Sequence, residues 1–473
     1  MAKDTKKYDV IVIGGGSGTK LIRPVAKIGL KVAVIEKDKM GGTCLNRGCI
    51  PSKMLIQSAD VISWILRAKN FEIDAKIDQI NFSKLVEQVN YTIDKEASEI
   101  PPSYEKIPNI DLYQKECKFI SDKVIQVADE KITADYFFLA IGVRPKIPAI
   151  KGLKETPYLT SNEALRNTKK PKKLVIIGGG YIGCELGFFY QMMGSEVHIL
   201  TDNGLLDKED IDIQKEFYEN FSKIVNVNLN CSVKEVAFKN SQFNVTFSQK
   251  EKRRSIISDA LMVATGVEPW TDHIGLENTD IKLDDKGFIQ VDEYLQTTQK
   301  NIWAFGDCIG RHLFRHTANY EGEHLFKTLF LEKEKKQLVY PPIPHAIFSF
   351  PRIGSVGKKE QELIDEKTPY VVGINKYCDS ARGMALRCSS GLVKLLFNKE
   401  DRKLIGAHCI GDEASNLVHM LIAFMKMNAT IDDLLDTIYI HPTLPEVIRN
   451  AAKKAVKNWD KVNKQSAKVN LTE

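Results

Sequence analysis

The chain has 473 residues, enough for about three domains at roughly 150 residues each. Apolar residues make up 43% and charged residues 27%, values that are ordinary for a soluble globular protein and exclude wholesale disorder. The formal net charge is +6, from 67 basic and 61 acidic residues, which is too mild at this length to indicate a nucleic-acid or membrane partner. We expect neither kind of partner.

The chain opens with a pattern typical of a nucleotide-binding βαβ unit. Residues 8–13 are a continuous apolar run that predicts a buried strand, residues 19–29 have helical spacing, and residues 31–35 predict a second strand. A glycine turn at residues 14–19 joins the first strand to the helix, so that a pyrophosphate can approach backbone N–H groups at the helix N-terminus. Glu36 ends the second strand, where a carboxylate can bind ribose hydroxyls. Thr19 stands at the third glycine position, which predicts looser helix–strand packing.

The same pattern returns about 160 residues later and predicts a second nucleotide domain. Strands are expected at residues 173–177 and 196–200, with a glycine turn at 178–183 and a helix at 184–193. Thr201 stands where a ribose-binding acid is expected, Asp202 follows it, and no Lys or Arg occurs until Lys208. Since Asp202 would repel a 2′-phosphate, the sequence favours NAD over NADP.

Two similar segments support this duplication. Residues 140–145, with Gly142, resemble residues 264–269, with Gly266, and each follows a short apolar strand. Each segment would close its nucleotide domain or return the chain to the neighbouring one. Further helices are expected at residues 79–98 and 211–222. From about residue 344 no glycine-rich nucleotide turn occurs, which indicates a third domain.

Seven of the nine cysteines are scattered singly, whereas Cys44 and Cys49 lie close together. Five residues of regular helix rise about 7.5 Å, too far for the 4.4–6.8 Å that separates the Cα atoms of a disulfide. The pair can therefore close only if Cys44 lies in an irregular turn leading into the helix, which Gly41, Gly42 and Gly48 favour. A metal site would need further Cys or His ligands nearby, so we expect a redox pair and no metal. The cysteine pattern and the polar N-terminus predict a cytoplasmic protein without a signal sequence.

These motifs together resemble the class I pyridine-nucleotide–disulfide oxidoreductases over essentially the whole chain. The residues that carry the resemblance are the two glycine turns, the cysteine segment 41–53, the segments 264–266 and 303–307, and the segment 441–446. The resemblance implies FAD-bound homodimers. The fold is expected to be α/β, with two Rossmann-like doubly wound dinucleotide-binding domains and an α+β C-terminal dimerisation domain. We expect FAD to be held by residues 1–150 and by a return segment at 271–343, NAD by residues 151–270, and the dimer interface by residues 344–473.

The resemblance also implies where each cofactor lies. Asp307 matches the residue that binds the flavin ribityl chain, and the helix near residues 316–320 matches one whose N-terminus faces the flavin. Tyr181 matches a gate over the nicotinamide pocket. Together, the turns and the resemblance assign cofactor binding to Gly14, Gly16, Ser17, Gly18, Glu36, Lys37, Gly42, Thr43, Lys53, Gly142, Gly178, Gly180, Tyr181, Ile182, Gly183, Asp202, Gly266, Gly306, Asp307 and Ala318.

The residues expected to carry the chemistry are Cys44, Cys49, His441, Glu446, Lys53 and Glu185. By resemblance, Cys49 faces the flavin, Cys44 exchanges with substrate, and Lys53 and Glu185 form an ion pair beside the flavin. His441 and Glu446 match an acid–base pair that completes the site of the other subunit. A thiolate is the attacking species in disulfide exchange, and a histidine poised near neutral pH can take and return its proton.

The implied activity passes two electrons between a dithiol substrate, the Cys44–Cys49 disulfide, FAD and NAD(H). The segment 51–53 and the NAD preference resemble dihydrolipoamide dehydrogenases, which predicts dihydrolipoamide as substrate and a lipoyl-carrying protein as candidate partner. Tyr439 stands where that group usually carries a second histidine and is closer to mycothione reductases. An NAD(P)H-dependent reductase of a low-molecular-weight disulfide is therefore the alternative; a non-catalytic flavin-binding protein is disfavoured by the intact catalytic residues. Arg47 could lower the pKa of Cys44, bind a substrate carboxylate, or simply be solvated.

Overall fold

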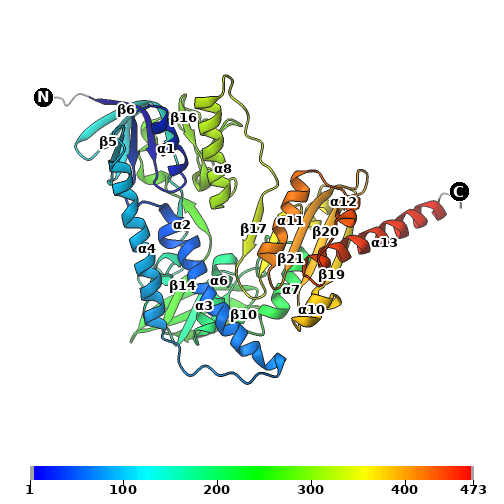
Figure 1. The fold of residues 1–473 in the computed structure, drawn as a ribbon. Coiled ribbons are helices and arrows are strands. Elements are labelled where there is room, and N and C mark those ends of the chain that lie inside the picture. Colours follow the sequence, from blue (N-terminus) through cyan, green and yellow to red (C-terminus); the bar gives the residue numbers. More distant parts are fainter. Residues whose placement is uncertain (1–4, 470–473) are drawn as a thin grey trace.

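The structure is a computed structural model that describes the backbone of residues 5–469 and the side chains of residues 5–459. Residues 1–4, on which part of the signal-sequence prediction depends, lie outside this range. Within residues 5–469, no helix combines the length and the hydropathy needed to cross a bilayer. The chain forms a mixed first sheet, a parallel second sheet and an antiparallel third sheet, together with two smaller antiparallel sheets. Figure 1 shows the third sheet at the opposite side of the molecule from β1.

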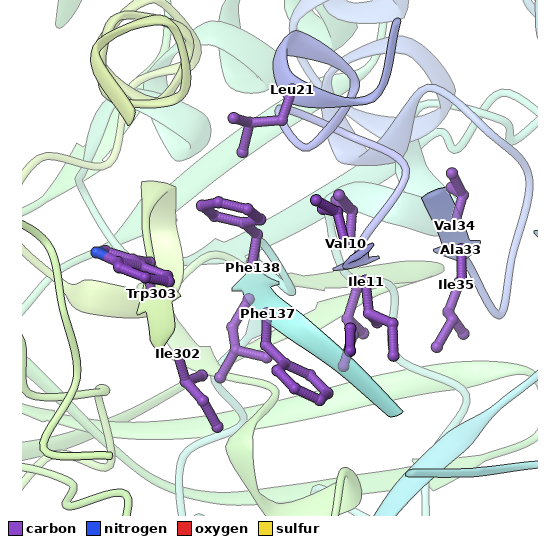
Figure 2. Close-up of a cluster of buried hydrophobic side chains, with 14 of the residues drawn as sticks. Val10, Ile11, Leu21, Ala33, Val34, Ile35, Phe137, Phe138, Ile302 and Trp303 are labelled. Atoms are coloured by element: carbon purple, nitrogen blue, oxygen red, sulfur yellow. The ribbon is translucent and has the colours of Figure 1, made fainter. Parts of the chain in front are cut away.

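The first sheet has the order β3-β2-β1-β6-β5-β4, and β16 pairs with β6. Its strands are β1 (Lys6–Ile13), β2 (Val32–Ile35), β3 (Ile110–Tyr113), β4 (Cys117–Ser121), β5 (Val124–Val127), β6 (Glu130–Leu139) and β16 (Ile302–Ala304). β1 runs parallel to both β2 and β6, with Ile11 opposite Ala33 and Phe137, which buries the apolar runs on both faces. The return of the chain at β16 places Ile302 opposite Phe137. Figure 2 shows these side chains forming one core with Leu21 of α1 (Thr19–Lys27).

The second sheet repeats this arrangement with the order β10-β9-β8-β14. Its strands are β8 (Lys173–Ile177), β9 (Glu196–Leu200), β10 (Asn226–Asn228) and β14 (Ala260–Val263), and its helices are α6 (Tyr181–Met192) and α7 (Ile211–Phe221). A separate antiparallel sheet contains β11 (Cys231–Lys239), β12 (Gln242–Gln249) and β13 (Lys252–Ser258). The predicted strands are confirmed. Helix α6 begins at residue 181, three residues before its predicted start at residue 184. Its first turn therefore contains Tyr181, Ile182 and Gly183.

The two similar segments of the sequence pair with each other. β7 (Val143–Pro145) and β15 (Val267–Pro269) form an antiparallel ladder that links the two nucleotide-binding sheets. α2 (Gly42–Arg47), α3 (Cys49–Arg67) and α4 (Phe82–Glu105) extend from the first sheet toward the second (Figure 1). The buried residues Leu55 and Ile56 of α3 share a core with Phe188 of α6. The cysteine segment is therefore fixed between the two sheets.

The third sheet has the order β17-β18-β21-β20-β19 and is antiparallel throughout. Its strands are β17 (Pro344–Ile347), β18 (Ile353–Gly357), β19 (Tyr370–Lys376), β20 (Leu392–Asn398) and β21 (Leu404–Ile410), covered by α11 (Ala414–Lys426) and α13 (Pro445–Val469). The short helices are α5 (Ser161–Ala164), α9 (Glu360–Asp365), α10 (Ala381–Ala385) and α12 (Ile431–Asp436). Shorter 3₁₀ and π turns are η1 (Ala68–Phe71), η2 (Thr271–His273), η3 (Leu276–Asn278), η4 (Gly306–Ile309), η5 (Lys327–Leu331) and η6 (Tyr377–Asp379). The predicted fold class, α/β with an α+β third part, is confirmed.

The first glycine turn corrects one prediction. A Cβ on Gly18 would lie 2.2 Å from the carbonyl oxygen of Gly14, and in the second turn a Cβ on Gly183 would lie 2.2 Å from that of Gly178. Gly18 therefore makes the close contact that was expected of the third glycine of the turn, one position earlier in the chain than the glycine spacing predicts. Thr19 starts α1 and donates its hydroxyl to Gly16 O at 2.8 Å. The expectation of looser packing at Thr19 is wrong, because the close contact is made by its neighbour.

A cluster of charges with a buried centre joins the second and third sheets. Nζ of Lys394 in β20 contacts Asp210 at 2.7 Å, Asp212 at 2.6 Å and Glu360 at 2.5 Å. The side chains of Lys394 and Asp210 are fully buried. Burial opposes both charges, but the pKa of Lys394 is raised by its hydrogen bonds to the carboxylates, and the pKa of Asp210 is lowered by His408 and Lys394. We call these four residues the Lys394 cluster.

Candidate active site

A cavity of about 400 Å³ opens between the first glycine turn, α2, α3 and the start of α8 (Arg315–Phe326). It brings together most of the predicted site residues of the first domain, and residues of α6. Those in its wall are Gly14, Gly16, Ser17, Glu36, Lys37, Gly42, Thr43, Cys44, Cys49, Lys53, Gly142, Tyr181, Ile182, Glu185, Gly306, Asp307 and Ala318. The predicted residues Gly18, Gly178, Gly180, Gly183, Asp202, Gly266, His441 and Glu446 lie outside this wall.

The wall is shaped for a dinucleotide at the end of β1. Glu36 accepts hydrogen bonds from the backbone N–H groups of Gly15 at 2.7 Å and Asp38 at 2.9 Å, which fix its carboxylate at the cavity. Burial raises the pKa of Glu36, and these N–H groups oppose the rise. Gly42 has φ +62°, and a Cβ there would lie 2.6 Å from the Cα of Gly16. Only glycine allows this approach, which leaves a narrow cradle suited to a pyrophosphate.

The two cysteines face each other across a helix break. Cys44 lies within α2 and Cys49 begins α3, with Gly48 between the helices. The predicted irregular turn at Cys44 is therefore wrong: Cys44 is helical, and the interruption falls at Gly48. The proximity of Cys49, together with burial, raises the pKa of Cys44, whereas the proximity of Cys44 lowers the pKa of Cys49 to about 7 against the effect of burial. Lys53 and Arg315 oppose the rise at Cys44 and add to the lowering at Cys49, so Cys49 is the thiol that ionises first.

Lys53 and Glu185 form the predicted ion pair. Nζ of Lys53 lies 2.8 Å and 3.0 Å from the two carboxylate oxygens of Glu185, which is almost fully buried in α6. The backbone N–H of Phe348, after β17, donates to the same carboxylate at 2.9 Å, and Lys53 lies 4.8 Å from the centre of the Phe348 ring. Elements from all three parts of the chain therefore hold this pair at the cavity.

Sequence reasoning missed one cation of this site, Arg315. It is the first residue of α8 and lines the cavity beside Asp307, whose pKa burial raises to about 6 while Arg315 opposes the rise. The described side chains give the Asp307 carboxylate no hydrogen-bond partner, which suits a hydroxylated ligand such as a ribityl chain. The available signal was an arginine directly before the predicted flavin-facing helix. Arg47, considered for a role at Cys44, instead forms an ion pair with Asp38.

His441 and Glu446 come together at the start of α13. Nδ1 of His441 lies 3.0 Å and 3.2 Å from the two carboxylate oxygens of Glu446, and Nη2 of Arg449 lies 2.8 Å from one of them. The His441 side chain is 70% exposed. Figure 1 shows α12 and α13 on the far side of the molecule from α2. Within one chain, the histidine is therefore not brought to the cysteines.

The second glycine turn lies at the carboxyl ends of β8 and β9. Gly178 has φ +115°. The buried Thr201 lies close to Gly179, since a Cβ on Gly179 would be 2.9 Å from the hydroxyl oxygen of Thr201. Asp202 follows Thr201 and is exposed. A carboxylate rather than a cation therefore occupies the position next to the turn.

Comparison with known proteins extends over this whole arrangement. Residues 8–322 match the model of the pyridine nucleotide-disulphide oxidoreductases, and residues 343–452 match the dimerisation domain of the same proteins. The chain is 32% identical to dihydrolipoyl dehydrogenase of Bacillus subtilis, over 95% of this chain and 96% of that protein. It is 31% identical to mycothione reductase of Mycobacterium tuberculosis, over 94% and 98%.

The fold is also similar to solved structures. The HOCl-induced flavoprotein disulfide reductase RclA from Escherichia coli superposes with a TM-score of 0.84 at 26% identity, covering 94% of this chain and 99% of that one. Its Cu(II) complex gives 0.85 at 25% identity, covering 95% and 99%. With these likenesses and a cavity that fits FAD, the chain belongs to the pyridine nucleotide-disulphide oxidoreductases, flavoprotein enzymes that use FAD and NAD(P)H and carry a dimerisation domain.

Proposed function

We propose that the protein is a dithiol–disulfide oxidoreductase in which Cys44 and Cys49 are the redox pair. The observation that carries this proposal is that both thiols lie close together in the wall of the cofactor cavity, beside the Lys53–Glu185 ion pair. Bound FAD would supply electron transfer between the dithiol and the pyridine nucleotide. Cys44 would exchange with the substrate sulfur, and Cys49, the more acidic thiol, would stay ionised on the cofactor side.

The cofactors are proposed to divide between the sheets as the sequence predicts. Residues 1–150 and 271–343 would hold FAD, because β16 and the turn carrying Asp307 return to the first sheet. Residues 151–270 would hold NAD, with the pyrophosphate at the start of α6 and Tyr181 over the nicotinamide. The exposed Asp202 disfavours a 2′-phosphate. We therefore expect kcat/KM for NADH to exceed that for NADPH, and the reverse order would contradict the NAD assignment.

The substrate that we propose is dihydrolipoamide, oxidised to lipoamide while NAD⁺ is reduced. Its two thiols would lose two electrons and two protons, and the Cys44–Cys49 disulfide would take up the electrons. His441 of the partner subunit would accept a proton from the attacking thiol, oriented by Glu446 of the partner subunit. Support comes from the 32% identity to dihydrolipoyl dehydrogenase over nearly the full length. A lipoyl-carrying protein is the corresponding candidate partner, and the cytoplasm the expected location.

One observation favours a second candidate, reduction of a low-molecular-weight disulfide by NAD(P)H. Tyr439, two residues before His441, is buried and donates its hydroxyl to Leu434 O at 3.0 Å. The side chain is thus used in packing and does not offer a second proton acceptor beside His441. The chain is also 31% identical to a mycothione reductase.

A direct comparison of two reactions separates these candidates. The purified holoenzyme would be assayed for NAD⁺ reduction by dihydrolipoamide and for NADH and NADPH oxidation by mycothione, glutathione disulfide and lipoamide. We expect the first reaction to have the highest kcat/KM. Robust oxidation of NAD(P)H by a small disulfide with no dihydrolipoamide activity would overturn the primary proposal in favour of the second. Inertness in both directions would overturn both.

A further inference from the structure

Arg166 lies outside the cavity wall, but its side chain contacts the segment between the two cysteines. It follows α5 by two residues, just before the chain enters the second sheet. Its Nη2 and Nε lie 3.1 Å and 3.4 Å from the backbone carbonyl oxygen of Asn46, and both nitrogens donate to it. Because Asn46 stands between Cys44 and Cys49, a residue from a distant part of the chain binds the redox segment directly.

The carbonyl group of Asn46 is left open by the helix break at Gly48. In one continuous helix this carbonyl would accept from the N–H of Ile50, four residues later. Residue 48 lies in no hydrogen-bonded helical turn, so the bond is not made. A carbonyl freed at a helix end needs another donor. The guanidinium of Arg166 is that donor.

Arg166 is itself held in place by α4. Its Nη1 lies 3.0 Å from Oδ1 of Asp94, which also pairs with Lys39 at 2.8 Å. Its own carbonyl oxygen accepts a hydrogen bond from Nδ2 of Asn90 at 3.4 Å. Although burial opposes the effect, Lys39 and Arg166 lower the pKa of Asp94, so this carboxylate stays charged at neutral pH. The guanidinium is therefore fixed from two sides while it binds Asn46.

The side chain of Asn46 anchors the same segment at its other end. It is buried, and its Nδ2 lies 3.1 Å from the carbonyl oxygen of Lys39 and 3.0 Å from those of Met40 and Gly42. Asn46 thus joins the turn before α2 to the break after it. Force applied at its carbonyl by Arg166 acts on the whole segment that carries Cys44.

We propose that Arg166 is a positioning residue for the redox pair, whose guanidinium holds the helix break between Cys44 and Cys49 by binding the carbonyl of Asn46. This inference rests on the proposed function of the two cysteines. Without Arg166, the reduced segment would be free to relax toward one regular helix. The Cα atoms of the cysteines would then lie about 7.5 Å apart, beyond the 4.4–6.8 Å that a disulfide allows. Arg166 therefore favours the disulfide over the dithiol.

The sign of this effect distinguishes positioning from electrostatics. A cation that acted through its charge would stabilise a thiolate and so favour the reduced pair. Loss of Arg166 would then favour the disulfide, whereas loss of the positioning contact favours the dithiol.

The test measures the equilibrium between the disulfide and the dithiol. The purified holoenzyme is equilibrated anaerobically with mixtures of reduced and oxidised dithiothreitol, quenched with acid, alkylated with N-ethylmaleimide under denaturing conditions and digested with trypsin. Cleavage after Lys39, Arg47 and Lys53 puts the two cysteines on different peptides, which stay linked only in the disulfide. On reduction the S–S bond breaks and takes up two electrons and two protons from dithiothreitol, which closes into its cyclic disulfide.

The variants are Arg166→Met, Arg166→Lys and, as a matched control, Arg253→Met, which removes an arginine paired with Glu235 at 3.5 Å on a separate sheet. Arg166→Met should shift the equilibrium toward the dithiol by about five- to tenfold, less than the full value of a hydrogen bond from a charged group because the guanidinium is partly exposed. Arg166→Lys keeps the charge and one donor in place of the fork, and should shift it by only about two- to threefold. Arg253→Met should match the wild type.

The outcomes separate this proposal from the proposed function. An unchanged equilibrium in Arg166→Met, or a shift toward the disulfide, would overturn the positioning role. If Arg166→Met fails to fold or to retain FAD, the comparison of Arg166→Lys with the wild type decides by the same criterion. A wild-type disulfide that dithiothreitol reduces, but that neither dihydrolipoamide nor NADH reduces, would refute the proposed function alone. Absence of linked peptides from the oxidised wild type would refute both.

Discussion

The contact between His441 and Glu446 determines which nitrogen of the imidazole can act. Glu446 is held by Thr443 N–H and Arg449 as well as by Nδ1 of His441. Although desolvation opposes the effect, these contacts hold the pKa of Glu446 below its ordinary value, so the carboxylate stays ionised and orients Nδ1. Nε2 is left free to exchange a proton, which is the geometry that an acid–base histidine requires.

Replacing His441 by alanine should therefore remove catalysis without removing the cofactor. We expect kcat to fall by about 10²- to 10⁴-fold at neutral pH, the range for loss of a general acid–base group. FAD absorbance should stay at the wild-type level, because His441 lies outside the cavity wall. His198→Ala is the matched control, since His198 also contacts a carboxylate, Glu196 at 2.7 Å. Retention of wild-type turnover in His441→Ala would exclude the proposed role.

Two residues mark the limits of sequence reasoning at this scale. The cysteine pair was predictable because its spacing and its glycines are local. Arg315 was not, because its importance comes from a cavity assembled by segments almost three hundred residues apart in the chain. Arg47 shows the reverse case: its position between the cysteines suggested a role, but the fold turns its side chain toward Asp38.

At the scale of elements, the glycine turns dock helices against strands through single close contacts. α1 and α6 both begin where a glycine lies against the carbonyl oxygen of the first glycine of the turn. The sequence predicted the strands and helices of both units, because continuous apolar runs next to glycine turns are strong local signals. The sequence pattern predicted the close contact of α1 at Thr19, whereas the structure has it at Gly18. The pattern fixes only the spacing of residues along the chain, but the contact depends on the path of the backbone.

The Gly18 contact leads to a prediction about α1. In Gly18→Ala the new methyl group would meet the Gly14 carbonyl oxygen at 2.2 Å, and backbone atoms cannot move aside cheaply. We expect α1 to shift, FAD retention to fall at least tenfold, and stability to drop by about 1–3 kcal/mol. Gly180→Ala, whose Cβ meets nothing within 4 Å, should retain FAD normally. Equal FAD affinities of the two variants in a titration of the apoprotein would show that the contact is unimportant.

Across the whole molecule, the three parts are joined by polar contacts that no local pattern reveals. The order of the parts and the return of the chain to the first sheet were predictable from the motifs. The Lys394 cluster was not, since its four residues come from β20, α9 and the start of α7 and carry no motif. Likewise, the pairing of β7 with β15 appears only when both halves have folded.

The Lys394 cluster should contribute strongly to stability. Lys394→Met would leave the fully buried carboxylate of Asp210 without its cation and should destabilise the protein by about 3–5 kcal/mol. Lys403→Met, which breaks an exposed pair with Asp401, should leave the urea midpoint unchanged. Because the pKa of Asp210 is lowered in the folded protein, Asp210 contributes to the free energy of unfolding above about pH 4, and this contribution is lost on acidification. Because the pKa of Lys394 is raised, Lys394 contributes below about pH 10, and this contribution is lost at higher pH. Equal midpoints of Lys394→Met and wild type between these limits would contradict the assignment.

The exposed histidine makes the dimer a requirement for activity in our proposal. Ile438 and Ile440, just before His441, are 96% and 78% exposed, which fits a surface covered by a second copy. If the site is shared, a Cys44→Ser chain and a His441→Ala chain, each inactive alone, should complement each other. The mixed dimer keeps one site with an intact cysteine pair and an intact histidine.

Random mixing makes about half of the dimers mixed, and each mixed dimer has one working site of two. The purified mixed dimers should therefore recover about half of the wild-type turnover. The two variants would be co-expressed with different affinity tags, and the doubly tagged dimers purified and assayed with FAD content as the reference. A mixture of Cys44→Ser with Cys49→Ser chains is the control and should stay inactive, since neither chain offers a cysteine pair. Absence of recovery in verified mixed dimers would mean that His441 serves its own chain, which the separation of α13 from α2 in Figure 1 argues against.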